Sequence, residues 1–132
     1  MGGHMTLHIV QLGSRRQQGE GPRLGTVRHP PRGVPKAEFA SRDYYDVWLP
    51  NLAPSRELLR SIDRSQPNWW RRFVPRFKAE MKRPEAASVL DALAALSHHA
   101  NFAIGCYCDD EEHCHRSILR ELLAARGAVL SR

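Results

Sequence analysis

The sequence of 132 residues is the length of one compact domain, and its hydrophobic fraction of 42% is enough to form a core, which excludes a disordered chain. Lys and Arg exceed Asp and Glu by 20 to 14, so the net charge is +6 and an anionic partner is favoured. The longest apolar run, residues 101–108, is far shorter than the roughly 20 residues that span a bilayer. We therefore expect a cytoplasmic protein with no membrane partner, one domain over residues 5–132 and an expression scar at residues 1–4.

Three short segments in the first part of the chain have the composition of strands. Residues 7–12 alternate weakly, residues 23–28 are stopped by prolines, and residues 44–49 are rich in aromatic and β-branched side chains. The polar segment 14–22 between the first two is expected to be a mobile loop.

The middle of the chain has the periodicity of helices. Ser55 is expected to cap a short helix. A longer helix with an aromatic inner face should begin near Pro67 and continue to Met81, with a kink or a break at Pro75. Another helix should begin at Pro84.

Residues 102–108 form a continuous apolar run of strand length, as expected for an interior strand covered on both faces. An amphipathic helix that ends at Gly127 should follow, and residues 128–130 should add a last short strand. Strands that alternate with amphipathic helices predict the α/β class, here a single-domain three-layer sandwich with a mostly parallel sheet.

The segment 105–116 holds all three cysteines of the chain, Cys106, Cys108 and Cys114. This clustering does not suit a disulfide framework and is typical of a protein from a reducing compartment. The segment joins the carboxyl end of the interior strand to the start of a helix, where open α/β sheets bind their ligands. Cys114, His115 and Arg116 supply a nucleophile, a titrating group and a fixed cation within one turn.

These residues resemble the DUF488 family, whose hallmark is a hydrophobic strand that ends in a cysteine and an acidic turn, followed by Cys-His-Arg on the last helix. Further motifs of the family follow in order between Leu7 and Gly127: Arg28 with Pro31-Arg32-Gly33, Asp46-Val47-Trp48-Leu49, Leu52-Ala53-Pro54-Ser55, residues 70–77, Glu80 and Cys114-His115-Arg116. The resemblance implies an α/β fold of uncharacterised function, so it adds no reaction. The form with two cysteines at the strand end is typical of a subgroup.

Four hypotheses compete for the segment 105–116. In the first, the cysteines are small core residues. In the second, helix amides and Arg116, helped by Arg32, hold a phosphate or carboxylate, provided that the acidic run 109–112 points away.

The third hypothesis makes Cys114 a nucleophile whose pKa is lowered by the helix N-terminus and by Arg116, with Cys106 or Cys108 as resolving partner. The phosphatase-type spacing, a cysteine and an arginine separated by five residues, does not occur after Cys106 or Cys108, where Glu112 and Cys114 stand in place of the arginine, so that mechanism is not expected at these two cysteines. The fourth hypothesis is a metal held by Cys106, Cys108 and Cys114, although adjacent donors at positions 113–115 would diverge by about 100° each on a helix.

We therefore predict a protein that binds, and in one version also processes, an anionic ligand such as a nucleotide or a nucleic acid. Arg28, Arg32 and Arg116 are the predicted anion contacts, Cys114 and His115 the catalytic candidates, and Arg71, Arg72, Arg76 and Lys78 a nucleic-acid surface. The alternatives are a thiol-dependent redox or covalent-catalysis enzyme and a noncatalytic interaction module. No cofactor is expected, and the sequence leaves enzymatic activity and oligomeric state open.

Overall fold

A computed structural model describes residues 5–131, so the expected scar at residues 1–4 lies outside the described residues. The strands are β1 (Leu7–Gln11), β2 (Arg23–Gly25), β3 (Val47–Trp48) and β4 (Phe102–Cys106), and the α-helices are α1 (Arg56–Ser61), α2 (Trp69–Met81), α3 (Pro84–Leu96) and α4 (His115–Ala125). Short 3-10 helices occur at Lys36–Glu38 (η1), Pro50–Leu52 (η2) and Glu111–His113 (η3). None of the helices within residues 5–131 is long and apolar enough to cross a membrane.

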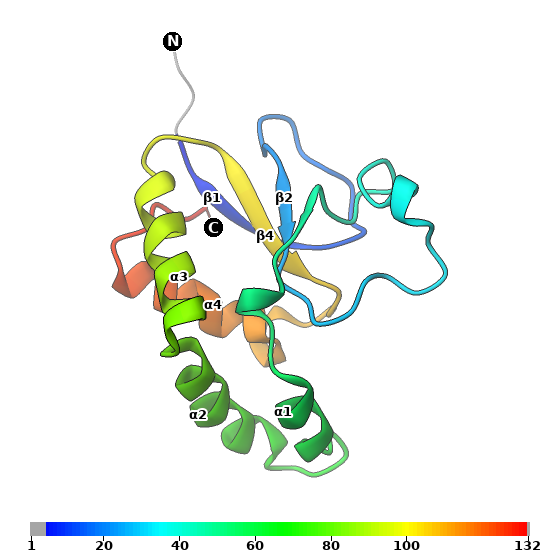
Figure 1. Ribbon diagram of the computed structural model, residues 1–132, viewed down its shortest axis with the longest axis vertical. Coiled ribbons are helices and arrows are strands. Elements are labelled where there is room, and N and C mark those ends of the chain that lie inside the picture. Colours follow the sequence, from blue (N-terminus) through cyan, green and yellow to red (C-terminus); the bar gives the residue numbers. More distant parts are fainter. Residues whose placement is uncertain (1–4, 132) are drawn as a thin grey trace.

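The four strands form one parallel sheet in the order β1-β4-β2-β3 (Figure 1). Leu7 pairs with Phe102 and Arg23 with Ala103, so β4 lies between β1 and β2. All five residues of β4 are buried, which confirms the predicted interior strand, although the chain leaves the sheet after Cys106. The protein is therefore a single-domain α/β protein with an all-parallel sheet.

One face of the sheet packs against the α-helices. Side chains alternate between the two faces of a strand, so every second residue of β4 points toward the helices. Phe102 and Ile104 of β4 belong to a core that also receives apolar residues from all four α-helices, including Leu58, Phe77 and Leu119. Figure 1 shows α3 and α4 beside the sheet, with α1 and α2 below the carboxyl ends of the strands. The helices therefore form one layer, and α1 and α2 lie near the carboxyl ends of the strands.

Irregular chain forms the layer on the other face. A smaller core there contains Leu12, Val27 and Tyr45. The predicted loop 14–22 contributes Glu20, whose carboxylate lies 2.6 Å from Nε of the buried Arg23. This layer is built from loops and η1 because the connections β1 to β2 and β2 to β3 contain no α-helix among the described residues.

Several predicted elements differ at their ends. The second and third strands are shorter than predicted, and Leu130 forms a single bridge to Leu7 in place of a last strand. Ser55 caps α1 as expected, since its Oγ accepts a hydrogen bond from the amide of Leu58 at 3.0 Å. Of the expected kink or break at Pro75, the break does not occur: α2 continues through the proline, because buried residues anchor the helix on both sides of it.

Gly21 is a position at which any side chain should disrupt the fold. Its φ is +82°, and a Cβ atom would lie 1.9 Å from the carbonyl oxygen of Asn101. We expect Gly21→Ala to lower the free energy of unfolding by about 2 kcal/mol or more, because backbone strain and overpacking add. Gly33→Ala is the matched control, since φ is +72° there but no atom lies within 4 Å. Equal losses for both variants in urea denaturation would contradict this account.

A cationic cavity over a cluster of three thiols

The candidate site forms where β4 ends and α4 begins. The chain leaves β4 at Cys106, passes through η3 and reaches Cys114, the N-cap of α4. Cys114 has the extended dihedral angles φ −131° and ψ 149°, so its side chain is not yet on the helical path. The predicted position of this segment, between the interior strand and a helix N-terminus, is confirmed.

The three cysteines come together in this turn as free thiols. Sγ of Cys106 lies 2.6 Å from Sγ of Cys114, and both residues are 1% exposed. Cys108 is half-buried, and the other two thiols shift its pKa. The cluster therefore contains two buried thiols, Cys106 and Cys114, and one half-buried thiol, Cys108.

The pKa values of the three thiols move in different directions. Hydrogen bonds from the thiols of Cys106 and Cys114 lower the pKa of Cys108, and Arg64 lowers it further. The contact with Cys108 raises the pKa of Cys106. For Cys114 the contact with Cys106 lowers the pKa, but Cys108 and burial outweigh it and raise the pKa above its usual value. The expectation that Cys114 carries the lowered pKa is therefore wrong, because burial and neighbouring sulfur act more strongly there than the helix N-terminus.

His115 is held in one tautomer by the backbone of the segment after β2. Its Nε2 lies 2.5 Å from the carbonyl oxygen of Thr26, which can only accept a hydrogen bond, so Nε2 carries the proton. Nδ1 is then free to accept, and it lies 3.8 Å from Sγ of Cys114. Burial lowers the pKa of His115 to about 4, so the imidazole is neutral at pH 7.

Arg116 is buried, with 4% of its surface exposed, and it does not line the cavity described below. Its guanidinium donates a hydrogen bond to the carbonyl oxygen of Cys108 at 2.7 Å, while its Nε has no partner among the described residues. The structure therefore places this predicted anion contact behind the turn, where it fixes the backbone of Cys108.

The acidic run 109–112 lies outside the cavity. Asp109 accepts a hydrogen bond from Gln11, Asp110 from the amide of Glu112, and Glu111 forms an ion pair of 3.1 Å with Arg120. None of the four carboxylates lines the cavity next to the thiols. The orientation that the anion hypothesis requires is therefore present.

A cavity of about 510 Å³ opens beside the carboxyl ends of the strands, and Cys106, Cys108 and His115 line it. Much of its wall is apolar or aromatic and includes Val27, Pro31, Tyr44, Leu59 and Tyr107. The basic residues Arg28, His29, Arg32 and Arg64 also line it, and no acidic residue among 5–131 does so. The cavity thus combines an apolar wall with a positive rim, which suits an organic anion.

The predicted anion contacts Arg28 and Arg32 both line this cavity, but they differ. The guanidinium of Arg28 donates to the carbonyl oxygens of Pro50, Ala53 and Pro54 at 3.0–3.2 Å, so it chiefly holds the chain before α1. Arg32 is exposed and has no ion pair among the described residues. The guanidinium of Arg32 is therefore available to bind an anionic ligand.

Sequence reasoning missed Arg64, which follows α1 and lines the cavity beside Cys108. The only local signal in the sequence was an arginine shortly before Trp69. In the structure, Cζ of Arg64 lies 4.8 Å from the centroid of the Trp69 ring. Its approach to a thiol about 44 residues further along the chain depends on how α1 and α2 pack against the strand ends, and no sequence pattern contains that information.

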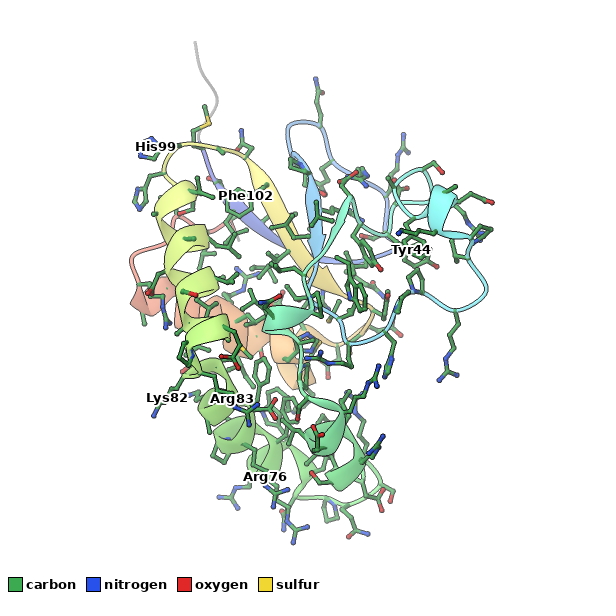
Figure 2. The ribbon with its side chains drawn as sticks, in the orientation of Figure 1. Tyr44, Arg76, Lys82, Arg83, His99 and Phe102 are labelled. Atoms are coloured by element: carbon green, nitrogen blue, oxygen red, sulfur yellow. The ribbon has the colours of Figure 1, made fainter. Side chains whose placement is uncertain are left out.

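The predicted nucleic-acid surface on α2 lies apart from the cavity. Arg71 and Arg72 are exposed, Arg76 donates to Oγ of Ser61 at 3.1 Å, and Lys78 lies 3.6 Å from Glu121. None of these α2 cations lines the cavity. Figure 2 shows Arg76 at the far end of the helices from Tyr44, which lines the cavity.

A metal ion is also compatible with part of the cluster. The ligand atoms of Cys106, Cys114 and His115 lie within 4.8 Å of one another. The helical argument against adjacent ligands does not apply here, because Cys114 precedes the helix and its thiol turns back toward Nδ1 of His115. Two sulfurs and one nitrogen suit a thiophilic cation such as Zn²⁺, with the Thr26 carbonyl orienting the imidazole.

The fold and this site define a parallel α/β protein with a cluster of three free thiols at the carboxyl end of its interior strand. A family model for DUF488-N3a, described as the active DUF488-N3 subclade, matches residues 7–127. The chain therefore belongs to the DUF488 family. We found no significant match among curated proteins or among solved structures.

Proposed function

We propose that this DUF488 protein is a thiol-dependent enzyme that binds an anionic ligand of nucleotide size and forms a covalent bond to it through Cys108. The observation that carries the proposal is the position of Cys108: its thiol, with a lowered pKa, lines a cavity whose charged side chains are all basic. We place the protein in a reducing compartment such as the cytoplasm, which keeps the three thiols free.

Each neighbour has a defined part in this proposal. The neighbouring thiols of Cys106 and Cys114 lower the pKa of Cys108 and so favour its thiolate. Arg116 fixes the carbonyl group of Cys108 and so orients the turn that carries the thiolate. Arg32 and Arg64 attract the anion. This arrangement assigns the nucleophile to Cys108 in place of Cys114, which is enclosed and does not line the cavity.

The covalent step is a nucleophilic displacement. Sγ of Cys108 forms a bond to an electrophilic atom of the bound anion, and the bond between that atom and its leaving group breaks. The electron pair departs with the leaving group, which takes a proton from water in the open cavity. A second displacement by water at the same atom restores the thiolate and releases one proton to solvent.

The proposal is tested by comparing two alkylating reagents of similar size, anionic iodoacetate and neutral iodoacetamide. Both report the same thiolate, so the ratio of their rates at Cys108 does not depend on its pKa. We expect this ratio to exceed that of free cysteine by about tenfold, because an attraction of about 1.4 kcal/mol from the basic rim acts on iodoacetate alone.

The double variant Arg32→Gln with Arg64→Gln should bring the ratio close to that of free cysteine. The matched control, Arg71→Gln with Arg72→Gln, removes equal charge from α2 and should leave the ratio unchanged. A ratio at Cys108 equal to that of free cysteine in the unmodified protein would contradict an anion site. Labelling of all three thiols only after unfolding would favour a noncatalytic interaction module.

The contact between Cys106 and Cys114 favours a second candidate function, two-electron thiol redox chemistry. In that case the thiol of a neighbour attacks Sγ of a Cys108 adduct, a disulfide forms, and the bound group leaves reduced by two electrons. Mass spectrometry after a single turnover distinguishes the two reactions. A disulfide within the cluster indicates redox chemistry, and three regenerated thiols indicate displacement.

A further inference from the structure

A second cavity adjoins the first one at α1. It has a volume of about 350 Å³ and is lined by His29, Arg56, Leu59 and Arg60. His29 and Leu59 also line the thiol cavity, so the two hollows share a wall. Leu59 is 39% exposed at this boundary. A ligand that fills the first cavity can therefore extend over Leu59 toward the two arginines of α1.

The arginines on this path are not neutralised by the protein. No carboxylate among residues 5–131 lies within 4.0 Å of the guanidinium groups of Arg32, Arg56, Arg60 or Arg64. Glu57 lies on the same helix, where the charge of Arg60 helps to lower its pKa, but it lines neither cavity. Asp63 accepts hydrogen bonds from Ser65 at 2.6 and 2.9 Å. The path therefore presents a row of cations that form no ion pair among the described residues.

The spacing of these cations suits a chain of phosphates. Arg56 and Arg60 are four residues apart on α1, so they share one face with Cβ atoms about 5–6 Å apart. Arg32 and Arg64 form a second pair at the thiol cavity. A mononucleotide needs one such pair, whereas two pairs that line adjoining hollows fit successive phosphates of a polymer.

The wall of the thiol cavity suits a base that has left its stack. Tyr44 and Tyr107 lie edge to face with ring centroids 6.1 Å apart, and both line the cavity together with prolines. Aromatic walls hold bases of any sequence, but a base within a duplex is stacked and cannot enter such a hollow without being flipped out. This favours a single strand over a duplex. It also favours nucleic acid over an anionic membrane, which has no group to fill the hollow.

We propose that the two cavities together bind single-stranded nucleic acid, with one nucleotide in the thiol cavity and the phosphates of its neighbours along Arg56 and Arg60. The inference rests on the proposed function for the identity of the reactive site and extends it to the substrate class. It also moves the nucleic-acid surface from α2 to α1.

The test uses the full chain carrying Cys108→Ser, which prevents turnover. Its affinity for a fluorescent oligothymidylate of twelve nucleotides is measured by an anisotropy titration. The double variant Arg56→Gln with Arg60→Gln should weaken binding at least about tenfold. It should also reduce the slope of log affinity against log salt by about 1.4, since each lost phosphate contact on a single strand contributes about 0.7. The control pair Arg71→Gln with Arg72→Gln should change affinity less than twofold.

Further titrations distinguish the sources of phosphate. Oligouridylate and oligothymidylate should both bind, and the matching duplex and thymidine monophosphate should bind at least about tenfold more weakly. Equal weakening by the α1 and α2 pairs, equal binding of the duplex, or preferential binding to vesicles of anionic lipid would overturn the inference. Absence of oligonucleotide binding with the iodoacetate preference intact would overturn this inference but not the proposed function. Loss of the iodoacetate preference with oligonucleotide binding intact would overturn only the proposed function.

Discussion

Between pH 5 and pH 8, the rate at which iodoacetamide labels Cys108 should change by less than about twofold. An ordinary thiol with a pKa near 8.5 becomes about tenfold more reactive with each pH unit in this range, because only the thiolate reacts. Cys108 differs because the thiols of Cys106 and Cys114 lower its pKa and keep it ionised throughout. Site-resolved mass spectrometry of the labelled protein measures the profile.

The profile also separates the three cysteines. Cys106 and Cys114 are 1% exposed and have raised pKa values, so they should remain unlabelled in the folded protein over the same range. Cys106→Ala removes the thiol that lowers the pKa of Cys108 most. The pKa of Cys108 should then be higher, and its labelling rate should rise with pH. A midpoint near pH 8.5 in the unmodified protein would show that Cys108 is an ordinary thiol.

Arg23→Met should lower the free energy of unfolding by about 3–5 kcal/mol, because it leaves the carboxylate of Glu20 buried and unpaired. Arg23 is 1% exposed, and its guanidinium donates to Glu20 and to the carbonyl oxygens of Ser14 and Asp43 at 2.6, 2.8 and 2.7 Å. It thus joins the loop after β1 to the segment before β3. Urea denaturation followed by circular dichroism measures the loss.

Arg16→Met is the matched control for this variant. Arg16 forms an ion pair of 2.9 Å with Asp46, but its side chain is 26% exposed, so its removal should lower the free energy of unfolding by about 1 kcal/mol or less. Should Arg23→Met fail to fold, Glu20→Gln provides the smaller perturbation of the same pair. Losses of the same size at positions 16 and 23 would contradict the buried pair as a structural centre.

The same pair predicts how stability depends on pH. Burial raises the pKa of Glu20, but hydrogen bonds from Arg23 and from the amide of Gln17, together with the charge of Arg23, outweigh it and lower the pKa below the usual 4.5. Because the pKa is lower in the folded state, the contribution of Glu20 is complete above about pH 4.5. It is lost as pH falls through the folded value. Glu20→Gln should remove this part of the acid dependence.

Two buried thiols next to the half-buried Cys108 lower the pKa of its thiol and so determine which cysteine is ionised. A lone cysteine at a helix N-terminus gains reactivity from the helix dipole. Here the neighbouring sulfurs have the larger effect on the pKa of Cys108, and Arg64 adds to it from a different part of the chain. The acidic run 109–112 does not oppose this, because Asp109 and Glu111 bind Gln11 and Arg120 outside the cavity.

The sequence by itself determined the elements whose signals are local. The apolar run beginning at Phe102 predicted the interior strand, Ser55 predicted the cap of α1, and Pro84 predicted the start of α3. These succeed because periodicity and capping depend on residues within about one helical turn of one another. The family motifs are likewise read from adjacent residues, which is why the sequence alone indicates the DUF488 family.

Only the tertiary structure decided which thiol is the most exposed in the cavity and which cations surround it. Cys106 and Cys114 are eight residues apart, and their contact depends on the path of the turn between β4 and α4. Arg64 reaches Cys108 only because α1 and α2 pack beside the strand ends. Burial and the charges of distant segments set a pKa, so the order of reactivity among three neighbouring cysteines depends on residues that sequence spacing cannot bring together.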